Sequence, residues 1–153
     1  MRTYLYYDAV KIDGPKKKIL EFNEADKFMD DKDLKVFDGL CDVLSNKEKF
    51  FTTKISDYQD KLMEKLLELP VDKIFPVLDL YRIFLTHPDA TCHFKKYEDG
   101  KSRIWVFVSC LNSKNATDPT IMLSLRCLCN IFKDMNGQFC LREMRERVME
   151  AVA

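Results

Sequence analysis

The residues most able to do chemistry in this chain are its cysteines and histidines. Cys92 and His93 are neighbours, and a thiol beside an imidazole base is the pairing that a cysteine hydrolase uses. Adjacent residues on a helix point about 100° apart, so these two side chains cannot easily form a hydrogen bond. His87 could serve a cysteine only through space. A thiol-dependent hydrolase therefore stays open as an alternative function, and the sequence designates no catalytic residue.

The same cysteines do not form a metal-binding pattern. Cys127 and Cys129 are two residues apart, which on a helix turns their sulfur atoms about 200° away from each other. The acidic run Asp30, Asp31 and Asp33 lacks the glycine and the terminal glutamate of a calcium-binding loop. We therefore expect no metal ion and no other cofactor. The cysteines lie mostly among apolar residues, and we expect them to be buried, reduced thiols. They are Cys41, Cys92, Cys110, Cys127, Cys129 and Cys140.

Two amphipathic segments carry a polar stripe beside their apolar face. The stripe positions are Asp79, Arg82 and Thr86 in the first segment and Arg126, Asn130 and Lys133 in the second. Arginine offers paired donors to a carboxylate, and the asparagine amide can pair with the main chain of a peptide. A groove floored by Arg82, Arg126 and Asn130 would therefore suit an extended acidic peptide. The alternative interpretation is that Arg82 pairs with Asp79 and that Arg126 covers its own helix with its aliphatic stem.

Composition and charge narrow the range of partners. The chain has 25 basic and 25 acidic residues, so its overall charge predicts no nucleic-acid partner and no acidic membrane partner. Its apolar runs, such as residues 104–110, are far too short to span a bilayer. A hydrophobic content of 46% with 33% charged residues is typical of a globular chain. The length suits a single domain over residues 1–153.

Apolar residues recur at helical spacing along most of the chain. Helices are expected over residues 15–22, 31–45, 56–69, 71–86, 104–111, 120–133 and 138–152, with a further short helix over 88–94. Residues 47–53 and 97–101 are expected to be connectors. Asp118 is expected to cap the helix that follows it, and Asn136 with Gly137 to end that helix. The pattern gives seven or eight helices and no convincing strand.

A repeat is visible when Arg82 is aligned with Arg126. The alignment places Tyr81 over Leu125 and Leu85 over Cys129, among other apolar pairs. The sequence distance between the two aligned arginines lies within the roughly 40–47-residue period of HEAT and armadillo repeats. We therefore expect an all-α fold, an armadillo-like right-handed superhelix, whose inner helices line a concave surface.

Two sequence motifs resemble those of a known family. Residues 74–88, IFPVLDLYRIFLTHP, are similar to the FP-x-LD-x-x-R…HP segment of the PUL domain of phospholipase A2-activating protein. Residues 120–132, TIMLSLRCLCNIF, resemble the later L-x-LR-x-x-x-N-x-F helix of that domain. Residues 136–138 and a final helix that contains Arg145 continue in the same order, so the resemblance spans nearly the whole chain.

The resemblance implies a non-enzymatic interaction module. PUL domains of this kind bind the acidic C-terminal tail of valosin-containing protein, the AAA ATPase of ubiquitin-dependent degradation, in the cytoplasm and nucleus. The matching motif positions here are Arg82, Arg126 and Asn130. Ubiquitin would be contacted only through neighbouring domains of a parent protein.

The resemblance also predicts a shortened domain. The family's domain is longer, so this chain is expected to be its N-terminal part, truncated at the C-terminus. An uncapped terminal helix is expected to favour self-association, since solenoid ends need capping. A purely structural or dimerising helical domain is the remaining alternative.

Overall fold

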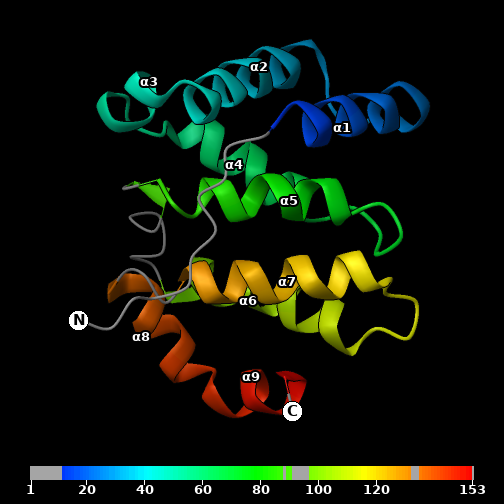
Figure 1. Ribbon diagram of the computed structural model, residues 1–153, viewed down its shortest axis with the longest axis vertical. Helices are drawn as coiled ribbons and strands as arrows, with labels where there is room; N and C mark the ends of the chain where they lie inside the picture. The colour runs from blue at the N-terminus through cyan, green and yellow to red at the C-terminus, as the bar shows by residue number, and fades with distance from the viewer. Residues whose placement is uncertain (1–11, 88, 91–96, 132–134, 153) are drawn as a thin grey trace.

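The computed structural model describes residues 12–87, 89–90, 97–131 and 135–152 (Figure 1). Within these residues all regular secondary structure is helical. The described residues contain nine helices, where seven or eight were expected: α1 (Asp13–Asp26), α2 (Asp31–Ser45), α3 (Lys47–Thr52), α4 (Asp57–Leu66), α5 (Phe75–Phe84), α6 (Tyr97–Asn112), α7 (Asp118–Ile131), α8 (Met135–Glu143) and α9 (Arg145–Val152). The expected all-α, armadillo-like fold is therefore confirmed.

The helices stack in a row along the long axis of the molecule. Helices α1, α5 and α7 lie side by side, with α5 packed between the other two (Figure 1). Helix α2 packs on α3 and α4, and α6 packs on α7, α8 and α9. Helices α1 to α3 form one end of the stack, and α8 and α9 form the other. The polar stripes expected on two segments therefore lie on adjacent helices, α5 and α7.

Two helix starts are fixed by reciprocal capping. Asp30 Oδ1 accepts a hydrogen bond from the Asp33 amide at 2.8 Å, and Asp33 Oδ2 accepts one from the Asp30 amide at 3.3 Å. Ser56 and Gln59 make the same exchange at the start of α4, at 3.2 and 3.0 Å. Each pair satisfies two amides that the helix itself cannot satisfy. The acidic run at residues 30–33 is thus explained by capping.

Two segments expected to be connectors are helical. Residues 47–53 contain α3, which Asn46 helps to begin: its Oδ1 accepts a hydrogen bond from the Lys49 amide at 3.3 Å. Residues 97–101 form the first turn of α6. Gly100 costs this helix about 1 kcal/mol relative to alanine, which the tertiary contacts of the remaining turns outweigh. Helix propensity alone misplaced both boundaries.

The predicted cap and stop signals in the last third of the chain are also wrong. Thr117, one residue before Asp118, caps α7: its carbonyl accepts from the Ile121 amide at 3.0 Å and its hydroxyl oxygen from the Thr120 amide at 3.5 Å. Asn136 and Gly137 lie inside α8 and do not end a helix. The single helix expected over 138–152 is interrupted at Met144, between α8 and α9, where the bend keeps Met144 in the core. The short helix expected over 88–94 falls largely outside the described residues.

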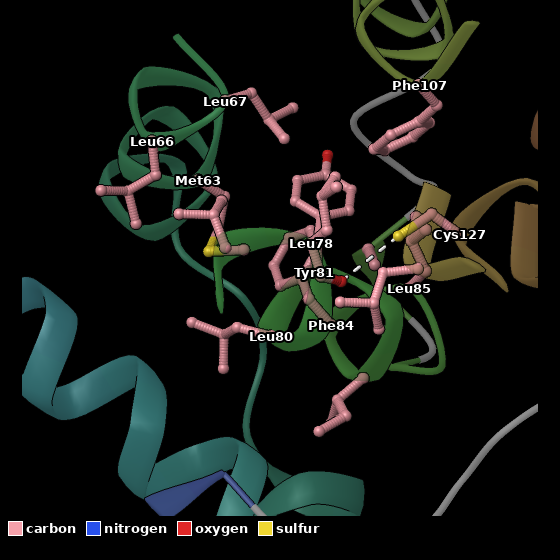
Figure 2. Packing of buried hydrophobic residues seen from close by; sticks show 14 of the residues in the cluster. Met63, Leu66, Leu67, Leu78, Leu80, Tyr81, Phe84, Leu85, Phe107 and Cys127 are labelled. Atoms are coloured by element: carbon pink, nitrogen blue, oxygen red, sulfur yellow. Dashed lines mark hydrogen bonds between the residues drawn. The ribbon is translucent and has the colours of Figure 1, made fainter. Parts of the chain in front are cut away.

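One apolar core runs through the middle of the stack (Figure 2). Tyr81 of α5 is fully buried, and its ring centroid lies 5.2 Å from that of Phe84 and 5.5 Å from that of Phe107 of α6. Met63 and Leu66 of α4 approach the same region. Aromatic contacts of this kind add stabilisation beyond the apolar area that they bury.

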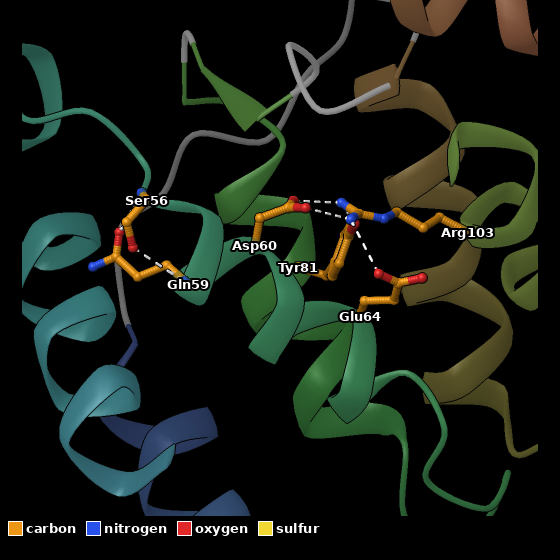
Figure 3. A network of polar contacts seen from close by, with 6 residues as sticks. All are labelled: Ser56, Gln59, Asp60, Glu64, Tyr81 and Arg103. Carbon is orange, nitrogen blue, oxygen red and sulfur yellow. Dashed lines mark hydrogen bonds and ion pairs between the residues drawn. The ribbon is translucent and has the colours of Figure 1, made fainter. Parts of the chain in front are cut away.

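A buried ion pair crosses this core. Arg103 of α6 donates from both terminal nitrogens to the two carboxylate oxygens of Asp60 of α4, each at 2.6 Å (Figure 3). One of these nitrogens also donates to the Tyr81 hydroxyl at 3.2 Å, and Glu64 lies 3.7 Å from the other. The Arg103 side chain is only 2% exposed. Three helices are therefore joined at one guanidinium, and burial raises the pKa of Tyr81, so its phenol stays neutral and can accept that bond.

Removing one partner of this pair should be costly. Asp60→Ala is expected to lower the free energy of unfolding by about 3–5 kcal/mol, because it leaves the Arg103 guanidinium buried without its main counter-charge. Lys65→Ala is the control, since Lys65 pairs with Asp33 at the surface and such pairs contribute about 0–1 kcal/mol. Urea unfolding of both variants measures their free energies of unfolding. Equal losses of stability would contradict the buried ion pair between Arg103 and Asp60.

Candidate functional site

Helices α5 and α7 are joined by two polar contacts. Asn130 Nδ2 donates a hydrogen bond to the Arg82 carbonyl at 2.7 Å, 48 residues away in sequence. Cys127 Sγ donates to the Leu78 carbonyl at 3.4 Å, 49 residues away. Both contacts advance in the same direction along the two helices, so α5 and α7 run parallel. We call this contact region, built around these four residues, the α5–α7 seam.

The repeat alignment of Arg82 with Arg126 does not describe the packing. Leu125 is 37% exposed and Cys129 is exposed, whereas their aligned partners Tyr81 and Leu85 are buried. The spatial match is four to five positions further along α7, as the two seam contacts show. The buried side of α7 includes small polar residues that the apolar pattern does not reveal. Ser124, for example, is fully buried and donates to the Thr120 carbonyl at 2.8 Å.

Arg82 is held close to the seam. Arg82 is 8% exposed, and its Nε donates to Asp79 Oδ1 at 2.6 Å. The pairing with Asp79 that the alternative interpretation expected is therefore present. The charges of Arg82 and Asp79 also act on Cys127 across the seam, although burial is the main reason that the pKa of this thiol is raised well above its ordinary value. Among the described residues, the two terminal nitrogens of Arg82 have no hydrogen-bond partner.

Asn130 and Arg126 occupy different environments on α7. Asn130 is fully buried, and its Oδ1 has no hydrogen-bond partner within the described part of the chain. As placed, this amide ties α7 to α5 and does not reach the surface. Arg126 precedes it by one turn on the same flank of α7 and is partly exposed. The structure thus brings Arg82 and Asn130 into contact and leaves Arg126 beside them at the surface; Lys133 lies outside the described residues.

The surface around Arg126 is apolar, which the sequence reasoning missed. Met122 is 47% exposed and Leu125 37% exposed, and Cys129 is exposed on the same face of α7. The repeat alignment paired Leu125 with Tyr81, which is buried, and so suggested a core position for Leu125. The signal that could have corrected this is the spacing of Thr120, Ser124 and Cys127, which share the opposite face.

Comparison with known proteins decides the family. The PUL domain profile matches residues 1–153, the whole chain. The chain belongs to the PUL domain family. It is also 30% identical over 95 residues to the Ubiquitin fusion degradation protein 3 homolog of Caenorhabditis elegans. That match covers 60% of this chain and 11% of the relative, so the chain corresponds to a small part of that protein's length.

The thiols of this PUL domain are mostly buried. Burial raises the pKa of Cys41 to about 12 and raises those of Cys110 and Cys140. Cys129 is exposed, which corrects the expectation that it would lie in the core; Cys92 lies outside the described residues.

The described histidine is engaged by the main chain. His87 Nδ1 accepts from the Asp89 amide at 3.0 Å, which leaves the proton on Nε2 to be donated to the Thr53 carbonyl at 2.9 Å. The Phe50 ring packs edge-to-face with the same imidazole, with the centroids 5.0 Å apart. His87 therefore joins the segment after α5 to the segment after α3.

Alkylation should separate these thiols. Cys129 is expected to react with iodoacetamide at neutral pH at least about tenfold faster than Cys41, Cys110, Cys127 or Cys140, because each unit by which burial raises a pKa removes about nine-tenths of the thiolate. Peptide mapping by mass spectrometry after brief labelling measures each site. Repeating the experiment in urea provides the control, since unfolding should make the rates similar. Rapid labelling of Cys41 or Cys127 in the folded protein would contradict the burial.

The seam asparagine should contribute to stability. Asn130→Ala is expected to lower the free energy of unfolding by about 1–3 kcal/mol, because the Arg82 carbonyl loses its donor within a buried contact. The exposed neighbour offers a matched control: Cys129→Ala should stay within about 0.5 kcal/mol of the unmodified chain. Thermal or urea unfolding provides the comparison, and an Asn130→Ala variant as stable as its control would show that the bond is dispensable.

Proposed function

We propose that this PUL domain is a non-catalytic peptide-binding module that recognises the acidic C-terminal tail of valosin-containing protein. Membership of a family of protein-interaction domains supports a binding role. The name of the relative, a ubiquitin fusion degradation protein homolog, supports a place in the ubiquitin pathway. The module would act in the cytoplasm and nucleus, where that ATPase works, and would meet ubiquitin only through neighbouring domains of a parent protein.

The observation that carries the proposal is the state of Arg82. Its guanidinium is almost buried and fixed through Nε, yet its terminal nitrogens have no partner among the described residues. An arginine in this state is prepared to bind a carboxylate, because planar paired donors match the two carboxylate oxygens. The charge-neutral composition of the whole chain does not oppose such recognition, which depends on local charge.

Arg126 and its surroundings extend the same surface. Its position one turn before Asn130 places it on the flank of α7 that faces the seam. Met122 and Leu125, both substantially exposed, lie on the neighbouring part of this helix. A peptide with acidic residues and an apolar side chain would find a matching surface there. Asn130 would act indirectly in this scheme, by holding α7 against the Arg82 backbone.

The other candidate functions have less support. A thiol hydrolase needs a low-pKa cysteine, whereas burial raises the pKa of Cys41, Cys110, Cys127 and Cys140. Self-association through the terminal helix stays a prediction, and Met149 and Val152 of α9, 61% and 44% exposed, are the residues that it would bury. Light scattering over a range of concentrations tests it, with Met149→Glu expected to return any dimer to monomer.

Charge reversal at Arg126 tests the peptide-binding proposal. Titration of a fluorescent peptide with the sequence of the ATPase tail should show binding that weakens as salt is added, since exposed charge pairs are screened. Arg126→Glu is expected to weaken this binding by about tenfold or more, equivalent to about 1.4 kcal/mol. Arg145→Glu on α9 is the matched control, because it makes the same change of charge at another exposed position.

The outcomes are distinct. An unchanged affinity in the control with a clear loss in Arg126→Glu supports a specific site on α7. Equal losses in both variants would reduce the effect to nonspecific attraction. If the unmodified domain fails to bind the tail at low salt, the proposed function is wrong.

A further inference from the structure

Arg82 is anchored twice, once through its backbone and once through its side chain. Its carbonyl accepts from Asn130 Nδ2 at 2.7 Å, which fixes the backbone of α5 against α7. Its Nε donates to Asp79 Oδ1 at 2.6 Å, one turn back along α5. The Asp79 side chain is 28% exposed and that of Arg82 is 10% exposed, so Asp79 is the more open to solvent of the two.

The choice of nitrogen determines what the guanidinium can still do. Arginine has five N–H donors, and the Nε–H is the one that Asp79 takes. The other four donors lie on the two terminal nitrogens of the guanidinium. Within the described residues these donors have no hydrogen-bond partner. A carboxylate that approached this end could receive two parallel hydrogen bonds.

We infer that Asp79 is a positioning residue, which holds the Arg82 guanidinium by its Nε so that the terminal nitrogens face an incoming peptide carboxylate. This inference rests on the proposed function. A long arginine side chain has many rotamers, and binding is weakened when the ligand must select one of them. Asp79 fixes the Arg82 rotamer before the peptide arrives. The entropy cost of ordering this side chain therefore does not reduce the affinity for the peptide.

The positioning role predicts that removal of Asp79 weakens peptide binding, which is the opposite of what its charge alone would predict. Asp79 carries a negative charge next to a site for an acidic ligand, so long-range electrostatics alone would make its removal tighten binding. Loss of the positioning bond would instead weaken binding. The two effects have opposite signs, and the sign of the measured change decides between them.

Two substitutions separate charge from orientation. Asp79→Ala removes the charge and the hydrogen-bond acceptor, and it should weaken binding of the tail peptide by about three- to tenfold, the effect of having to immobilise one more side chain. Asp79→Asn removes the charge but keeps an oxygen that can accept the Arg82 Nε–H, and it should bind the peptide as tightly as the unmodified domain or more tightly. Asp118→Ala, at the exposed start of α7, removes a carboxylate without touching Arg82 and should not weaken binding.

A second measurement follows the guanidinium itself. The Nε–H resonance of Arg82, assigned by its disappearance in Arg82→Lys, should be protected from solvent exchange in the unmodified domain and in Asp79→Asn. It should lose that protection in Asp79→Ala. Thermal unfolding of each variant confirms that the fold is intact, so a loss of overall structure is not mistaken for a loss of positioning.

The failure of this inference can be told apart from the failure of the proposed function. If the unmodified domain does not bind the tail peptide, the proposed function fails. If it binds and Arg126→Glu weakens binding, but Asp79→Ala binds equally well or more tightly, Asp79 merely repels the ligand and the positioning role is wrong. Equal weakening in Asp79→Ala and Asp79→Asn would also overturn it, because the amide variant keeps the acceptor.

Discussion

Arg103 reaches from α6 into the space between α4 and α5, and the position of three helices depends on the groups that pair with its charge. Asp60 supplies two matched oxygens, and the Tyr81 hydroxyl supplies a third contact from α5. A buried ion pair of this kind contributes little net stability compared with an apolar replacement of the same shape. Its constraint is geometric: α4, α5 and α6 can pack only in the arrangement that lets all three groups meet. Any other rotation of these helices would leave a charge buried without a partner, which is far more costly.

The same logic operates on a smaller scale between α5 and α7. An armadillo-like stack needs successive helices to lie in a defined register, and purely apolar faces specify register weakly, because one methyl group packs much like another. Asn130 and Cys127 each direct a side-chain donor to one carbonyl of α5, so a shift of either helix breaks both bonds. The seam is accordingly built from polar side chains within an apolar interface.

These features set the limit of what sequence reasoning achieved. The all-α fold and the family were predicted, because apolar spacing and two motifs are local properties of the chain. The polar stripe drew attention to Arg82 and Asn130, which meet at the seam, although their role as binding residues stays a prediction. Their burial was not predicted, since it depends on a helix 48 residues away in sequence. Arg103 attracted no notice, because an arginine before an apolar run resembles a surface residue until its partner on another helix is known. The inward face of α7 was misassigned for the same reason.

Two adjacent residues of α5 connect the packing of the core with the proposed binding site. Tyr81 and Arg82 point about 100° apart on the helix, one toward the Arg103 ion pair and the other toward α7. The contacts of Tyr81 fix the rotation of α5, and that rotation determines where the Arg82 side chain leaves the backbone. Asp79 then restrains the Arg82 side chain through its Nε, and Asn130 holds the Arg82 backbone against α7. A receptor for an acidic segment gains from such fixation, because a disordered peptide already loses much conformational freedom when it binds. Under the proposed function, an ion pair buried among α4, α5 and α6 would therefore influence recognition at the surface without touching the ligand, by determining the orientation of the helix that carries the arginine.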